Sequence, residues 1–115
     1  MNLEEAEKAF VESWNVLSQK MHKISKEKGF WDRPRNEGES IALIHSELSE
    51  GLEALRKGNP PDDKVPEFDS MSAEFADVLI RIGDHAQGFN YNVAEALVAK
   101  MKMNNTRKKM HGKTF

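Results

Sequence analysis

The 115-residue sequence contains no cysteine. Disulfide bonds, thiolate metal ligands and a cysteine nucleophile are therefore excluded. No apolar run approaches the roughly 18 residues that a membrane-spanning helix needs, and the N-terminus has neither the basic start nor the apolar stretch of a signal peptide. These absences lead us to expect a soluble, cytoplasmic protein with no membrane partner.

Strand-like alternation and internal repeats are also missing, and the chain has the length of one ordinary domain. Apolar residues instead recur at three- and four-residue steps in four stretches, the first running from Leu3 to near Gly29. This pattern predicts a single all-α domain over residues 1–115, with four main helices packed as a bundle and one longer crossover loop.

The second helix has clear signals at both ends. Asn36 and Glu39 form a capping box that should open it at about Glu37, and basic residues with a glycine at Lys57–Gly58 should end it. Its spacing predicts a buried stripe made of Ile41, Ile44, Leu48, Leu52 and Leu55.

The third and fourth helices have similar signals. Asp69 or Ser70 can cap the third helix, and Gly88 is expected to end it. Asn92 with Glu95 reads as a second capping box, which would open the fourth helix. The loop between the second and third helices contains three prolines and is predicted to be the crossover.

Two pairs of carboxylates lie in the apolar middles of two helices. Glu47 and Glu50 are three residues apart on the second helix, and Glu74 and Asp77 on the third, so each pair shares one face at about 60°. A single Glu-x-x-Glu is usually a solvated face, but four acids facing one another would repel unless a cation lay between them. Oxygen ligands favour Mg²⁺, with Mn²⁺ as a substitute, over zinc. Glu53 continues the spacing but lies about 120° around the helix from Glu47 and should be peripheral.

The positive charge is concentrated near the C-terminus. The net charge is −2, yet residues 100–115 contain six basic residues and no acid. Lys100, Asn104 and Arg107 share one helical face and could bind phosphates, which normally complete the shell of a carboxylate-bound Mg²⁺. In the irregular segment 29–38, Trp31 or Phe30 could stack on a base, or could instead cap the end of the core. Together these pieces describe a nucleotide site.

The sequence resembles the MazG-like superfamily of all-α nucleoside triphosphate pyrophosphohydrolases, which also contains dimeric dUTPases and dCTP pyrophosphatases. The resemblance lies in the strings HSELSEGLEALR and EFADVLIRI, in the upstream loop GFWDRPRNEGE and in the tail KMKMNNTRKKMHGKTF. It covers the chain from about Gly29 to Phe115. The first helix resembles the family only in its amphipathic pattern.

The resemblance implies Mg²⁺-dependent hydrolysis of a (d)NTP to its monophosphate and pyrophosphate, a reaction suited to cleaning the nucleotide pool. Glu47, Glu50, Glu74 and Asp77 would hold the metal, and water polarised by a metal or by one of these glutamates would attack the α-phosphorus. The resemblance also implies a homodimer or homotetramer, with substrate contacts at Lys100, Asn104, Arg107 and Trp31.

Two other functions are consistent with parts of the sequence. A nucleic-acid-binding module would explain the basic tail, but the acidic body would repel phosphate without a cation, so no nucleic-acid partner is expected. A non-catalytic helical oligomer or adaptor would explain the apolar stripes, but it gives no reason to place acid pairs in helix centres.

Overall fold

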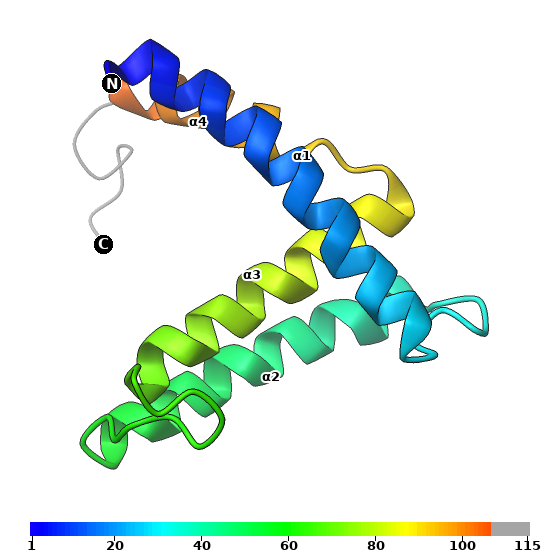
Figure 1. Cartoon of the computed structure of the whole chain (residues 1–115), viewed down its shortest axis with the longest axis vertical. Coiled ribbons are helices and arrows are strands. Elements are labelled where there is room, and N and C mark those ends of the chain that lie inside the picture. Colours follow the sequence, from blue (N-terminus) through cyan, green and yellow to red (C-terminus); the bar gives the residue numbers. More distant parts are fainter. Residues whose placement is uncertain (107–115) are drawn as a thin grey trace.

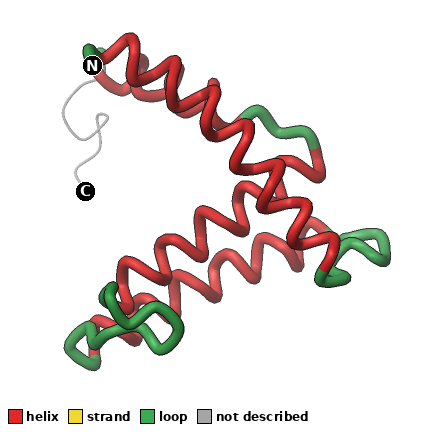
Figure 2. The backbone as a smooth tube through the Cα atoms, viewed as in Figure 1, coloured by secondary structure: helices red, strands yellow, loops and turns green. Residues whose placement is uncertain are grey.

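The computed structural model describes residues 1–106, in which the regular secondary structure consists of four α-helices. Turns and loops join the helices, and no strand is drawn in this part of the chain (Figure 2). The only strand-type pairing among these residues is an isolated bridge between Pro61 and Asp69. The predicted all-α fold is therefore confirmed. The four helices are α1 (Leu3–Glu27), α2 (Glu37–Arg56), α3 (Ser70–Phe89) and α4 (Val93–Asn105) (Figure 1).

The helices form two arms that meet at one end. α2 and α3 lie side by side and antiparallel, α1 crosses the C-terminal half of α3, and α4 folds back along the N-terminal half of α1 (Figure 1). The radius of gyration is 16.5 Å, whereas a compact domain of this length would have about 13 Å. The bundle is therefore open, and its four helices do not surround one shared core.

Most helix ends lie where local signals place them. The side chain of Asn36 accepts the N–H of Glu39 at 3.0 Å, and that of Asp69 accepts the N–H of Ser72 at 2.7 Å. α2 begins at Glu37, and Gly58 follows its C-terminus with a φ of 85°, which favours glycine. The predicted ends of α2 and the cap of α3 are confirmed.

Two predicted signals are wrong in detail. Gly88 does not end α3, because the helix continues to Phe89 and ends at Asn90, whose φ is 62°. Asn92 does precede α4, but its amide donates to the Glu95 carboxylate at 2.8 Å and caps no backbone N–H. Asn90 can take the left-handed conformation, so α3 needs no glycine at this position.

The prediction of which face of α2 is buried is wrong. Gly51 faces α3 so closely that a Cβ there would lie 3.3 Å from the side chain of Met71 and 3.5 Å from that of Glu74. Small side chains allow this close approach of two helices, and the large apolar residues then point elsewhere. The buried residues of α2 are Ser40, Glu47, Gly51 and Ala54. Of the predicted stripe only Ile44 is partly buried, while Ile41, Leu48, Leu52 and Leu55 are 44–52% exposed.

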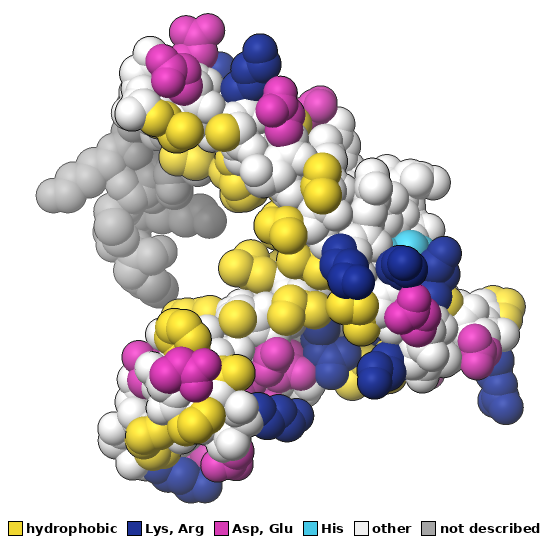
Figure 3. All heavy atoms as spheres, in the orientation of Figure 1, with side chains coloured by type: hydrophobic (Ala, Val, Ile, Leu, Met, Phe, Trp, Pro, Cys, Tyr) yellow, Lys and Arg dark blue, Asp and Glu magenta, His cyan; other side chains and the backbone are white. Residues whose placement is uncertain are grey.

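The apolar interior is small. Within residues 1–106, the buried hydrophobic residues are three alanines, Ala54, Ala86 and Ala94. Apolar side chains gather on the sides of the two arms that face each other (Figure 3). The accessible surface is 8928 Å², against about 6400 Å² for a compact protein of this mass. No helix of the described residues is long and apolar enough to cross a membrane.

Candidate metal centre

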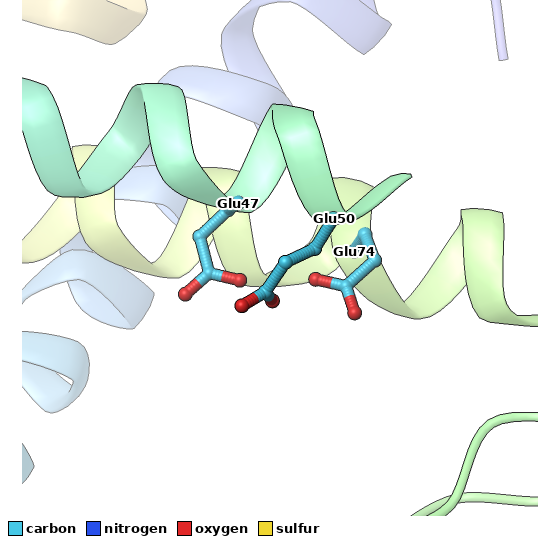
Figure 4. Close-up of side chains that lie close together, drawn as sticks. All are labelled: Glu47, Glu50 and Glu74. Carbon is cyan, nitrogen blue, oxygen red and sulfur yellow. The ribbon is translucent and has the colours of Figure 1, made fainter. Parts of the chain in front are cut away.

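Three carboxylates converge between α2 and α3. Glu47 and Glu50 project from one helix and Glu74 from the other, and one oxygen of each lies within 4.8 Å of the others (Figure 4). The antiparallel pairing of the two helices brings them together, as the acid spacing predicts. Glu53 lies outside this group, with its carboxylate 3.8 Å from Arg56 and Lys57. We call Glu47, Glu50 and Glu74 the acidic triad.

Asp77, the fourth predicted ligand, lies beside the triad but is not a member of it. Burial raises the pKa of its carboxyl, and the charge of Glu47 adds to the increase. Lys64 and Arg81 oppose these effects. Asp77 is therefore close enough to sense the triad, and it lines the same cleft as Glu47.

Glu47 is the buried and ionised member of the triad. Its carboxylate accepts a hydrogen bond from Arg81 Nε at 2.8 Å, which is also an ion pair. Burial opposes ionisation, but the bond from Arg81 and the neighbouring Glu74 outweigh it and lower the pKa of Glu47. Glu47 therefore stays negative at neutral pH, and its position is fixed by α3.

Glu74 is the member of the triad whose ionised form the surroundings disfavour. Burial and then the neighbouring carboxylates of Glu47, Glu50 and Asp77 raise its pKa from 4.5 to about 7. Its Oε2 atom is buried and has no hydrogen-bond partner among the described residues. A buried acceptor without a donor is unfavourable, so this oxygen is suited to a cation or a proton.

The triad lies between two clefts. One, which we call the α1–α3 cleft, has a volume of about 290 Å³ and includes Glu47 and Asp77. The other has a volume of about 350 Å³ and includes Glu50 and Glu74, with further acids from the α2–α3 loop. A ligand in either cleft could reach the triad.

A second buried acid organises the wall of the α1–α3 cleft. Asp84 accepts hydrogen bonds from Trp31 Nε1 at 2.9 Å and Arg35 Nη1 at 3.0 Å, and His22 Nδ1 lies 2.9 Å from its carboxylate. Burial opposes ionisation of Asp84, but hydrogen bonds from Ser25, His22, Trp31 and Arg35 lower its pKa. The network ties α1 and the α1–α2 loop to α3. Sequence reasoning gave Asp84, His22 and Arg35 no role in the site, although Asp84 follows Asp77 by seven residues and so shares its face.

Trp31 is part of this network. Its ring packs against His22 and Phe89, with centroid separations of 4.8 and 5.4 Å. A Cβ at Gly88 would overlap the indole ring, so the glycine makes room for it. A contact between Trp31 and a base stays a prediction, and it is the adjacent Phe30 that lines the cleft.

The remaining predicted substrate contacts lie on α4 or beyond it. Lys100 and Asn104 are exposed on a helix that packs along α1, where Lys102 lies 3.7 Å from Glu7. Arg107 lies outside the described residues. The structure therefore does not bring Lys100 and Asn104 into either cleft beside the triad.

Comparison of the chain with protein-family models, curated proteins and solved structures found no match. The resemblance to the MazG-like superfamily therefore stays a prediction that depends on the motifs alone.

Proposed function

We propose that the protein is an Mg²⁺-dependent nucleoside triphosphate pyrophosphohydrolase that converts a (d)NTP to the monophosphate and pyrophosphate, serving nucleotide-pool cleaning. The observation that carries the proposal is the convergence of Glu47, Glu50 and Glu74, with Asp77 beside them, at a cleft that also contains basic side chains. Carboxylates suit a divalent cation and basic groups suit phosphates.

The donor set fits magnesium. Its members are carboxylates, which are the hard ligands that Mg²⁺ and Mn²⁺ prefer. The unpartnered oxygen of Glu74 is the clearest sign, because a cation would satisfy it. Glu47, Glu50 and Glu74 would hold the ion with help from Asp77, and a bound ion would supply charge stabilisation at phosphate oxygens.

The two triad glutamates on α2, Glu47 and Glu50, differ in what they can do. Arg81 holds Glu47 in its charged form, which suits a fixed ligand. Glu50 is exposed and has no ion pair among the described residues, so one of its oxygens would contact the ion while the other would take a proton from water. In the proposed reaction this water attacks the α-phosphorus, the α–β anhydride bond breaks and pyrophosphate leaves.

The test is to incubate the purified protein with Mg²⁺ and a panel of (d)NTPs and to identify the products. Release of pyrophosphate, lost in Glu50→Gln and Asp77→Asn but kept in the matched control Glu53→Gln, would support the proposal. Orthophosphate as the only product, or no turnover with any nucleotide, would overturn it.

We further propose that the chain works as a homodimer or homotetramer. The excess of accessible surface over a compact chain is of the order that permanent interfaces bury. The outward stripe of α2 supplies an apolar surface for a second copy. Leu52→Asp would place a charge in that stripe, and sedimentation should then show a smaller species than the wild type. An unchanged mass would exclude the stripe as the interface.

The exposed apolar surface also favours a second function, a non-catalytic helical oligomer or adaptor. In that case the acids would serve no ligand. Glu50→Gln and Asp77→Asn would then both stabilise the protein, and calorimetry would detect no binding of Mg²⁺ or Mn²⁺.

A further inference from the structure

Four basic side chains line the α1–α3 cleft, but only two of them are paired. Arg35 forms an ion pair with Asp84 at 3.0 Å, and Arg81 forms one with Glu47 at 2.8 Å. Lys28 and Lys64 have no carboxylate within 4.0 Å in the part of the chain that the structure describes. These two ammonium groups are therefore available to a ligand.

The two lysines come from separate elements. Lys28 is the C-terminal cap of α1, and Lys64 lies in the α2–α3 loop, so the cleft receives a positive charge from each. The charge of Lys64 also acts on Asp77 beside the triad, because it counteracts the rise in the pKa of that carboxyl. An anion between the lysines would thus lie next to the triad.

The backbone positions both lysines in advance. The Asp62 carboxylate accepts the N–H groups of Lys64 and Val65, each at 3.0 Å, and fixes this part of the loop. The N–H of Lys28 donates to the carbonyl of Ile24 at 3.0 Å and continues the helical pattern. Only the side chains need to be ordered by a ligand, which limits the entropy cost of binding.

We infer that Lys28 and Lys64 form a phosphate subsite, in which they hold the phosphate chain of the substrate beside the acidic triad. The inference rests on the proposed function, and it assigns the phosphate contacts within this chain to residues other than Lys100 and Asn104. A chain of linked phosphates is the class of anion that can reach both lysines and a cation at the triad at the same time.

The α1–α3 cleft also suits the base of a nucleotide. Phe30 is 59% exposed and lines the cleft, and the Arg35 guanidinium lies 5.9 Å from its ring centroid. Met21, Ile24 and Ile80 extend this apolar wall. The cleft therefore combines an apolar wall with cationic groups, as a base joined to phosphates requires.

The experiment measures calorimetric binding of inorganic triphosphate in the presence of Mg²⁺ to the full chain. Lys28→Met and Lys64→Met should each weaken binding about tenfold, the effect of losing one charge-assisted contact. Lys64→Arg, which keeps the positive charge, should bind inorganic triphosphate more tightly than Lys64→Met. The matched control is Lys23→Met, which removes an exposed charge of α1 outside the cleft. Binding of Mn²⁺ alone should not weaken in any of the four variants, because each removes or keeps a positive charge and leaves the carboxylates in place.

The outcomes separate the subsite from the reaction. If the wild type does not bind inorganic triphosphate, or if the control weakens binding as much as the cleft variants, the subsite is wrong. If binding depends on Lys28 and Lys64 but no nucleotide yields pyrophosphate, the subsite stands and the proposed function fails. If pyrophosphate is released and a variant that combines Lys28→Met with Lys64→Met keeps the wild-type KM, the function stands and the subsite fails.

Discussion

Replacing Glu74 by Gln should stabilise the metal-free protein, because the variant mimics the protonated carboxyl that the fold favours. The pKa rises from 4.5 to about 7, which corresponds to an upper limit of roughly 3 kcal/mol. The triad borders open clefts, so solvent screening reduces the expected gain to about 1–2 kcal/mol. For a domain of this size the melting temperature should rise by roughly 4–8 °C.

The effect must depend on pH with a definite sign. Because the pKa of Glu74 is raised in the folded state, the proton is bound more tightly by the folded than by the unfolded chain. The stabilisation from this proton is fully present below about pH 4.5 and is lost as the pH rises through about 7. Glu74→Gln should therefore equal the wild type at about pH 4 and exceed it most at about pH 8.

The assay is thermal unfolding followed by circular dichroism, in chelator, at both pH values. Glu53→Gln is the control, because it removes an exposed carboxylate of α2 outside the triad. Added Mg²⁺ should raise the melting temperature of the wild type but not that of Glu74→Gln, since a ligand stabilises the state that binds it. A variant that is no more stable than the control at about pH 8 would refute this account of the triad.

Three further predictions concern the Asp84 network, the helix contacts at two glycines and the protons bound by Glu74. Asp84→Asn should lower the free energy of unfolding by about 2–4 kcal/mol, because the amide supplies no charge to the donors around it; a denaturant titration showing no loss would contradict this. Gly88→Ala should cost about 1–3 kcal/mol by pushing a Cβ against Trp31, and Gly51→Ala should cost less in the same titration because the flexible end of a methionine faces it. Equal losses would be inconsistent with this packing. Mn²⁺ binding at about pH 7 should release protons from Glu74, so its calorimetric enthalpy should vary with the ionisation enthalpy of the buffer; no variation would contradict the raised pKa.

The features that the sequence predicts well are local or follow from simple topology. The caps at Asn36 and Asp69 depend on residues three positions away, and both form. The triad needs only two facing helices, which one loop between α2 and α3 ensures. A Glu-x-x-Glu and a Glu-x-x-Asp were therefore sufficient to predict where three of the four carboxylates meet, while Asp77 lies beside them.

The predictions that failed required knowledge of neighbours distant in sequence. Periodicity shows that α2 has an apolar stripe, but it does not show which face another helix covers, and α3 packs on the face with Gly51. Gly88 looks like a helix breaker, yet its role is to admit the ring of Trp31. The contacts of Asp84 span 49 to 62 residues, so no local pattern could reveal them.

The position of Trp31 gives the protein a built-in optical reporter. Its indole donates to Asp84 and is adjacent in sequence to Phe30, so its emission should respond when a ligand enters the cleft or a proton reaches the network. The other tryptophan, Trp14, lies beside Phe10 on the N-terminal half of α1, at a centroid separation of 6.0 Å. Trp14→Phe would leave Trp31 as the single tryptophan, next to the lining residue Phe30, and binding could then be followed by its fluorescence without any added label.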